Sequence, residues 1–307
     1  MTEISATLVK ELREKSGAGM LDCKKALTET KGDVEAAMDH LRKKGLATAT
    51  KKSGRTVAEG LIGVASRGNA AVVIELNAET DFVARNEHFQ NFLAQITDLA
   101  LRDKIGTIEE LKAASLDGGT VEAALTALIA TIGENMALRR MQLLMVGQGV
   151  VATYVHNAAA PNRGKIGVLA AIESSGSVER LSALGRQLAM HIAAARPESL
   201  DVASLSKDTV ARERSVYADK ARQSGKPAEI VEKMVEGSLR KFYEQAVLLE
   251  QTFVVDGESK ISSVLEKVGR EVGSSVKIAG FIRYELGEGV EKKAGDFASE
   301  VAKMAAG

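Results

Sequence analysis

The fold is decided by residues 60–76, which read GLIGVASRGNAAVVIEL. Apolar runs at 61–64 and 71–76 flank the turn-forming residues Arg67, Gly68 and Asn69. Short apolar runs on either side of a glycine turn are typical of two antiparallel strands in a hairpin. The stretch therefore predicts a strand, a turn and a second strand.

A loop and a helix follow this hairpin. Residues 77–87 are mostly polar and predict a loop. Beyond them, apolar residues recur at spacings of three and four, which predicts an amphipathic helix; they are Phe89, Phe92, Ile96 and Leu99.

The same order returns later in the chain. Residues 150–155 and 166–172 predict a second pair of strands. A second helix face follows, formed by Leu181, Leu184, Leu188 and Ile192. We therefore expect an internal duplication, an α+β core of two similar halves with half-buried antiparallel sheets and helices on one side. The copies differ in the loop after the second strand, because residues 174–177 are only small and polar.

The two ends of the chain are predicted to be helical. Residues 4–45 predict three short helices separated by glycines, with Gly45 ending the third, and the small, basic stretch 46–55 predicts a flexible linker. Residues 208–223 predict a charged helix, and a further helix after the turn at 224–227 has the spacing of a coiled-coil arm. A strand at 276–286 precedes a short helix with Phe297, Val301 and Met304 on one face.

These patterns divide the chain into four parts. We expect an N-terminal helical module with its linker at 1–55 and the first half of the core at 56–149. The second half is expected at 150–286, with a helical hairpin inserted at about 195–228, and a C-terminal helical module at 287–307.

Composition excludes several classes of function. Lys plus Arg and Asp plus Glu both total 41 of 307 residues, and the chain has no Trp. A general nucleic-acid binder needs excess positive charge, and single-strand binders use aromatic stacking. Cys23 is the one cysteine, and the sequence has neither a signal-peptide pattern nor a run of about 18 apolar residues. We expect a cytoplasmic protein without a disulfide, a membrane span or direct nucleic-acid binding.

The sequence contains no recognisable catalytic or cofactor-binding pattern. No phosphate-binding glycine loop is present, and Gly17-Ala18-Gly19 lies between helices rather than after a strand. The four histidines are scattered without metal-ligand spacing, so we expect no metal site and no cofactor. We do not expect an enzyme.

One unusual feature remains, the segment Thr80-Asp81-Phe82-Val83 in a polar loop. In one interpretation, Asp81 caps the following helix and Phe82 folds back onto the core. In the other, Phe82 projects as a contact site, because an exposed Phe gains its roughly 1.5–3 kcal/mol of burial only when a partner covers it.

Residues 80–83 resemble the T-D-F-V signature of the elongation factor Ts family. Residues 12–27, LREKSGAGMLDCKKAL, resemble the family's ubiquitin-associated-like N-terminal module. Further similar stretches run along the chain, at 132–135, 139–140, 166–169, 190–194, 224–227, 232–237 and 281–283.

The resemblance implies a fold with an N-terminal helical module, a duplicated core, a coiled-coil arm and a C-terminal helix. It also implies a function, guanine-nucleotide exchange on elongation factor Tu during translation elongation. Thr80, Asp81, Phe82 and Val83 would disturb the partner's magnesium site. The residues that would bind the partner are Met20, Leu21, Ile132, Gly133, His156, Phe297 and Val301. In the family, the turn that follows the position of His156 is usually shorter than the turn that residues 157–162 predict in this chain.

Two other classes of function stay open. One is a nucleic-acid binder using a basic arm, although the balanced net charge argues against it; its residues would be Arg42, Lys43, Lys44, Lys51, Lys52 and Arg55. The other is a scaffold that binds through its helical arm without exchange activity.

Overall fold

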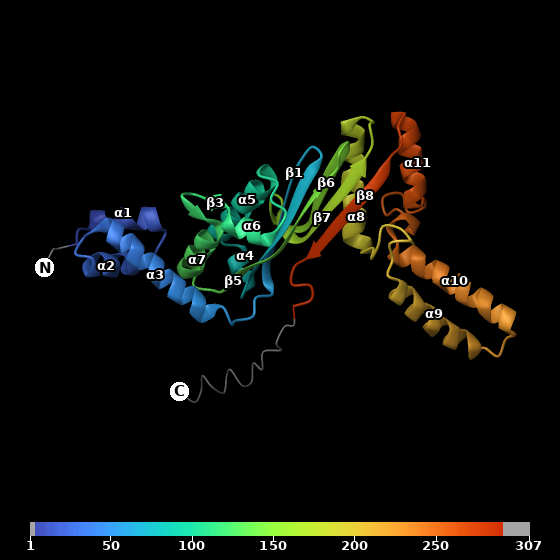
Figure 1. Cartoon of the computed structure of the whole chain (residues 1–307), viewed down its shortest axis with the longest axis horizontal. Helices are drawn as coiled ribbons and strands as arrows, with labels where there is room; N and C mark the ends of the chain where they lie inside the picture. Colours follow the sequence, from blue (N-terminus) through green and yellow to red (C-terminus); the bar gives the residue numbers. More distant parts are fainter. Residues whose placement is uncertain (1–3, 291–307) are drawn as a thin grey trace.

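The protein is described here by a computed structural model that covers residues 4–290. Its helices are α1 (Ala6–Ser16), α2 (Met20–Glu29), α3 (Val34–Lys52), α4 (Asp81–Ala84), α5 (Glu87–Arg102), α6 (Ile108–Ala113), α7 (Val121–Ile132), α8 (Val178–Ala195), α9 (Lys207–Arg222), α10 (Ala228–Ala246) and α11 (Ile261–Val272), with a 3-10 turn η1 (Leu248–Glu250). The strands are β1 (Glu59–Arg67), β2 (Ala70–Ala78), β3 (Ser115–Leu116), β4 (Gly119–Thr120), β5 (Met136–Met145), β6 (Gly149–Ala160), β7 (Arg163–Glu173) and β8 (Lys277–Glu285). Figure 1 shows their arrangement.

Six strands form one antiparallel sheet, so the α+β class is confirmed. The strand order is β5-β2-β1-β7-β6, and β8 also pairs with β7. Strand pairing joins the first half of the sheet to the second at the start of β7, where Ile62 pairs with Gly164 and Gly63 with Arg163. The predicted hairpin at 60–76 is confirmed, with β1 and β2 paired from Glu59↔Ala78 to Arg67↔Ala70.

The expectation of a half-buried sheet is wrong, whereas each half of the sheet carries its helices on one side, as expected. Alternate residues of β2 point to different cores: Val72 and Ile74 pack beneath α5, whereas Val73 packs against the second half of the sheet. In the second half, Ile172 packs against α8 and Leu169 packs in the layer between the halves. The molecule is therefore layered helix, sheet, sheet, helix (Figure 1).

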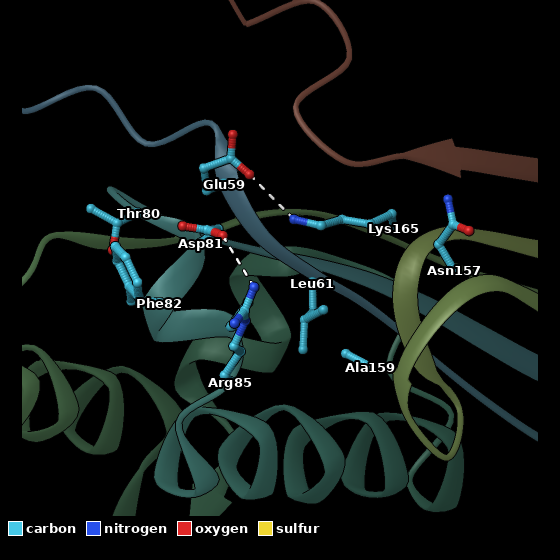
Figure 2. A pocket seen from close by; sticks show the side chains of 10 residues that line it. Glu59, Leu61, Thr80, Asp81, Phe82, Arg85, Asn157, Ala159 and Lys165 are labelled. Atoms are coloured by element: carbon cyan, nitrogen blue, oxygen red, sulfur yellow. Dashed lines mark hydrogen bonds and ion pairs between the residues drawn. The ribbon is translucent and has the colours of Figure 1, made fainter.

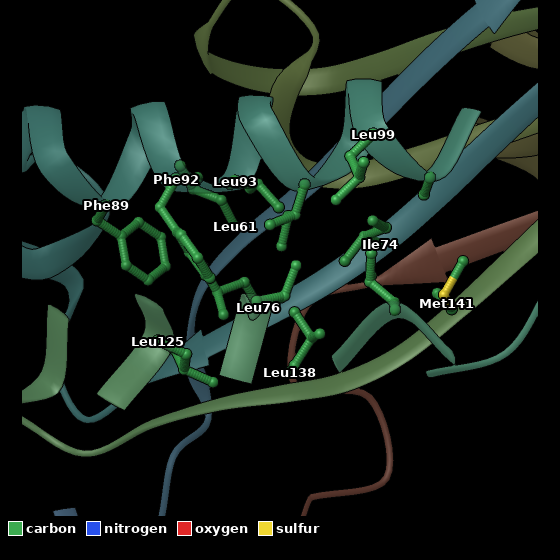
Figure 3. Packing of buried hydrophobic residues seen from close by; sticks show 14 of the residues in the cluster. Leu61, Ile74, Leu76, Phe89, Phe92, Leu93, Leu99, Leu125, Leu138 and Met141 are labelled. Carbon is green, nitrogen blue, oxygen red and sulfur yellow. The ribbon is translucent and has the colours of Figure 1, made fainter. Parts of the chain in front are cut away.

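The first of these cores lies between α5 and the first half of the sheet. Figure 3 shows Phe89, Phe92 and Leu93 of α5 above Leu61 and Leu76 of the sheet. The helix presents these residues because its apolar positions recur at the helical period, as predicted for Phe89 and Phe92. Leu93 joins the predicted face. This core supports the loop that joins β2 to α5.

Three N-terminal helices are confirmed, but the third does not end at Gly45. It continues to Lys52, so residues 46–52 are helical rather than a flexible linker. Gly45 is buried, and a Cβ at this position would lie 3.4 Å from the Cβ of Ala130 on α7. Packing against the core therefore extends the helix past a residue that ends helices elsewhere.

The helical hairpin consists of α9 and α10 and spans Lys207–Ala246 rather than about 195–228. The expected start is too early because α8 continues to Ala195. The expected end is too early as well, since residue 228 only begins α10. This helix belongs to the hairpin, because its Val235 and Leu239 pack against Ala221 of α9. The hairpin extends away from the sheet (Figure 1).

The predicted strand near the C-terminus is confirmed as β8. The predicted C-terminal helix with Phe297, Val301 and Met304 lies outside the described residues. None of the helices within residues 4–290 combines the length and apolar character needed to cross a membrane.

Candidate functional site

The segment 79–86, called here the Phe82 loop, connects β2 to α5. It contains one helical turn, α4, where the sequence predicted an irregular loop. Asn86 caps α5, since its side chain accepts hydrogen bonds from the amides of His88 at 2.9 Å and Phe89 at 3.4 Å. The interpretation in which Asp81 caps α5 is therefore wrong.

The α4 turn separates its residues between core and solvent. Val83 and Ala84 are buried in the core beneath α5, whereas the Phe82 side chain is 75% exposed. The interpretation in which Phe82 folds back onto the core is wrong as well. The Gln90 side chain also donates to the Ala84 carbonyl at 2.8 Å, which ties the turn to α5.

A hollow of about 560 Å³ lies between the Phe82 loop and the β6–β7 hairpin (Figure 2). Asp81 forms an ion pair with Arg85 at 3.7 Å on the loop side, and Lys165 pairs with Glu59 at 3.2 Å. The lining residues are Glu59, Leu61, Thr80, Asp81, Phe82, Ala84, Arg85, Asn157, Ala159 and Lys165. The exposed Phe thus lies beside paired charges rather than on a uniform apolar patch.

The base of the Phe82 loop is attached to residues 133–135, which follow α7. Thr80 donates to the Glu134 carboxylate twice, from its amide at 3.0 Å and from its hydroxyl at 2.7 Å. The amide of Asn135 donates to the carboxylate of Glu79 at 2.6 Å. These bonds join segments more than 50 residues apart.

The matching loop in the second half is different. Residues 174–177 are held close to the end of α11, with the hydroxyls of Ser175 and Ser274 2.7 Å apart. A Cβ at Gly176 would lie 2.6 Å from a methyl carbon of Val272. Position 176 therefore has no room for a side chain, and this loop carries no aromatic residue.

The other predicted contact residues are spread over the molecule. Met20 and Leu21 are 57% and 76% exposed at the start of α2, in the N-terminal module. Ile132 packs partly against the first core, and Gly133 ends α7 in the left-handed conformation next to Glu134. These two residues thus lie close to the Phe82 loop.

His156 lies on β6, next to Asn157, which lines the hollow. Its Nδ1 is 3.1 Å from the hydroxyl of Tyr154. The long turn predicted at 157–162 is wrong, because β6 extends to Ala160 and β7 begins at Arg163. Only Pro161 and Asn162 separate the strands, and Asn162 has a φ of 60°, the left-handed value that Asn tolerates at the second central position of a turn after Pro.

Several basic residues of the predicted arm contact groups within the protein. Lys44 pairs with Asp22 at 2.6 Å, and Arg55 with Glu79 at 3.3 Å. Lys52 donates to the carbonyl of Gly133. These contacts give three of the six basic residues a structural role. Within residues 4–290, no cluster of three or more His, Cys, Asp or Glu side chains is arranged to hold a metal ion.

Sequence reasoning missed a buried ion cluster around Glu75. This fully buried carboxylate contacts Arg139 at 3.0 Å and Arg140 at 2.5 Å, and it accepts from the amide of Gly287 at 2.9 Å. Burial raises the pKa of the Glu75 carboxyl, but the bonds from Gly287 and Arg140 outweigh burial, so that its pKa is lowered. In the sequence, the signal for this cluster was Glu75, the single charged residue within the apolar run 71–76.

Comparison with known proteins assigns the family. Residues 79–288 match the family described as Elongation factor TS. Elongation factor Ts of Rhodospirillum centenum is 61% identical over 307 residues, covering 99% of this chain and 100% of the relative. The elongation factors Ts of Rhodospirillum rubrum and Paramagnetospirillum magneticum are 58% and 59% identical, covering 98% and 99% of this chain and 98% of each relative. This chain therefore belongs to the elongation factor Ts family of translation factors.

Proposed function

We propose that this chain is a guanine-nucleotide exchange factor for elongation factor Tu. It binds the GDP-bound partner, disturbs the partner's magnesium site with the Phe82 loop and promotes GDP release, so that GTP can bind. It makes and breaks no covalent bond itself. The observation that carries the proposal is a Phe82 side chain 75% exposed on a loop whose neighbouring residues are fixed.

An exposed Phe on a fixed loop suits this role. Its ring gains roughly 1.5–3 kcal/mol when a partner covers it. Because Val83 and Ala84 are buried and Thr80 is bonded to Glu134, little conformational entropy remains to be lost when the ring enters the partner. The ring can therefore displace groups in the partner rather than yield to them.

Magnesium is a suitable target for such displacement. Mg²⁺ requires nearly ideal octahedral geometry, so a small shift of the groups around it weakens its binding. The phosphates of GDP then lose a counter-ion. Factor and nucleotide consequently bind the same partner antagonistically, and each lowers the affinity of the other by the same ratio.

The energetics require more than the Phe82 ring. A thousandfold acceleration of release corresponds to roughly 4 kcal/mol off the barrier. Burial of one Phe does not supply this, so other contacts must provide binding energy that the Phe82 loop converts into distortion. We propose this role for Met20, Leu21, Ile132, Gly133 and His156, and for Phe297 and Val301 beyond the described residues.

Stopped-flow release of a fluorescent GDP from elongation factor Tu tests the proposal. Phe82→Ala is expected to lower the maximal release rate at saturating factor by tenfold or more, about 1.4 kcal/mol or above. The matched control is Val178→Ala, which trims another exposed apolar residue, 62% exposed, after the matching loop of the second half. Wild-type rates with Phe82→Ala would refute the role of the ring.

A second variant separates binding from release. Leu21→Ala removes an exposed apolar side chain from the N-terminal module and is expected to raise the factor concentration for half-maximal release, with the maximal rate kept. This point variant is preferable to deleting the module, because α3 packs against α7 and its removal would expose the core. Binding without accelerated release by the wild-type chain would identify the scaffold alternative instead.

A further inference from the structure

The hydroxyl of Thr80 has an unusual partner. Thr80 precedes α4, where a Thr side chain commonly accepts a bond from the amides of its own helix. Here it makes no such bond, and the hydroxyl donates to the carboxylate of Glu134 at 2.7 Å. The amide of Thr80 donates to the other oxygen of the same carboxylate at 3.0 Å. A residue 54 positions away therefore takes the place of a local cap.

Glu134 is itself held firmly by its neighbours. Gly133, on one side, ends α7 and accepts a hydrogen bond from Lys52 at the end of α3. Asn135, on the other side, is buried and donates its side-chain amide to the carbonyl of Arg55 at 2.9 Å. The carboxylate thus projects from a backbone fixed on both sides toward the Phe82 loop.

We propose that Glu134 is a positioning residue for nucleotide exchange, which sets the direction of α4 and hence of Asp81 and Phe82. It does not need to touch the partner's nucleotide or magnesium. This inference rests on the proposed exchange function and adds a residue that acts through Thr80.

Helix α4 needs this support because it is short. Four residues are far below the length at which a helix is stable alone, so outside contacts must fix its direction. Val83 and Ala84 anchor its buried side, but its start depends on Thr80 and Glu134. Charged acceptors form the stronger hydrogen bonds, and a carboxylate satisfies both Thr80 donors at once.

The test compares three variants in the stopped-flow release assay. Glu134→Ala removes both bonds and is expected to lower the maximal release rate about tenfold, equal to about 1.4 kcal/mol. The half-saturating concentration should stay unchanged, because Met20 and Leu21 remain. Glu134→Gln keeps an acceptor for the Thr80 amide and a donor for its hydroxyl, so it should recover most of the rate. Glu122→Ala removes an equal charge from an exposed position on α7 and should release GDP at the wild-type rate.

A double variant separates this inference from the proposed function. If Glu134 acts through the loop, Glu134→Ala combined with Phe82→Ala should release GDP no more slowly than Phe82→Ala alone. A slow Phe82→Ala with a wild-type Glu134→Ala would overturn the positioning role and leave the exchange function standing. The positioning role would also be overturned if the reduction in release rate of the double variant equalled the product of the reductions in the two single variants.

Hydrogen exchange in the free protein gives a readout independent of release. Two amides report on the start and the end of α4: that of Thr80, which donates to Glu134, and that of Arg85, which donates to the carbonyl of Phe82. Glu134→Ala should accelerate exchange of both amides by tenfold or more, whereas Glu122→Ala should not. Unchanged protection at Thr80 and Arg85 would refute the positioning role even if the release rate fell. Faster exchange at both amides combined with wild-type release by Phe82→Ala would support the positioning of the loop and reject its exchange function.

Discussion

At the residue scale, His191 makes the stability of the protein depend on pH. Its ring is fully buried; Nε2 lies 2.8 Å from the side-chain oxygen of Gln251, and Nδ1 accepts from the amide of Val254 at 3.2 Å. Burial lowers the pKa of His191, although the bond to Gln251 opposes this. Protonation would turn Nδ1 into a donor and break the bond from Val254.

The pH dependence follows from the lowered pKa of His191. The unfolded chain has an ordinary His pKa of about 6.5, so as the pH falls it takes up a proton at a higher pH than the folded chain does. The stability contribution of neutral His191 is therefore present above pH about 6.5 and is lost as the pH falls below it. Urea unfolding at a series of pH values should show a falling free energy of unfolding on the acid side. His191→Gln should flatten this slope, and an identical slope in both proteins would contradict the assignment.

At the scale of the element, α3 contains a glycine, Gly45, whose backbone conformation is one that any residue can adopt. Gly45 lies in the helix interior, and a Cβ there would sit at ordinary contact distance from Ala130. Gly45→Ala should therefore raise the free energy of unfolding by about 0.5–1 kcal/mol, because Gly costs this much in a helix interior. Denaturant unfolding measures the change.

Gly133 provides the matched control for Gly45. It ends α7 with a φ of 88°, a conformation that Ala adopts only with strain. Gly133→Ala should accordingly lower the free energy of unfolding by about 1 kcal/mol. Two Gly→Ala changes at the contact between α3 and α7 would then have opposite signs, and equal signs would argue against the observed end of α7.

At the scale of the whole molecule, the two halves of the sheet approach each other closely at Gly167. A Cβ on this residue of β7 would lie 2.4 Å from Cγ2 of Ile62 and 3.0 Å from Cγ1 of Val64. Both neighbours are β-branched and fully packed, so they cannot easily move aside. Gly167→Ala should lower the free energy of unfolding by about 2 kcal/mol through overpacking.

Gly280 on β8 gives the control for this prediction. The nearest atom to a Cβ there is a methyl carbon of Leu144 at 3.9 Å, so Gly280→Ala has room. Thermal unfolding of the two variants should show a clear loss of Tm for Gly167→Ala and little change for Gly280→Ala. Equal Tm values would mean that the halves are packed less tightly than described.

The sequence by itself determined the local elements and the difference between the two loops. Hydrophobic period and turn residues depend only on neighbours in the chain, so they predicted β1, β2, α5, β7 and α8 correctly. The aromatic residue in one loop and its absence from residues 174–177 could also be read directly. The contact roles of Phe82, Met20, Leu21 and the other predicted residues stay predictions.

Only the tertiary structure decided which faces are covered and what holds the site. The apolar runs of the strands did not reveal that the two halves of the sheet pack face to face. A continuous apolar run indicates a buried strand, but it does not show whether a helix or a second sheet covers each face of that strand. The helical continuation past Gly45 depends on Ala130, and the support of Thr80 depends on Glu134. Each of these contacts joins residues more than 50 positions apart, and such pairings depend on how the assembled elements pack, which local sequence patterns do not encode.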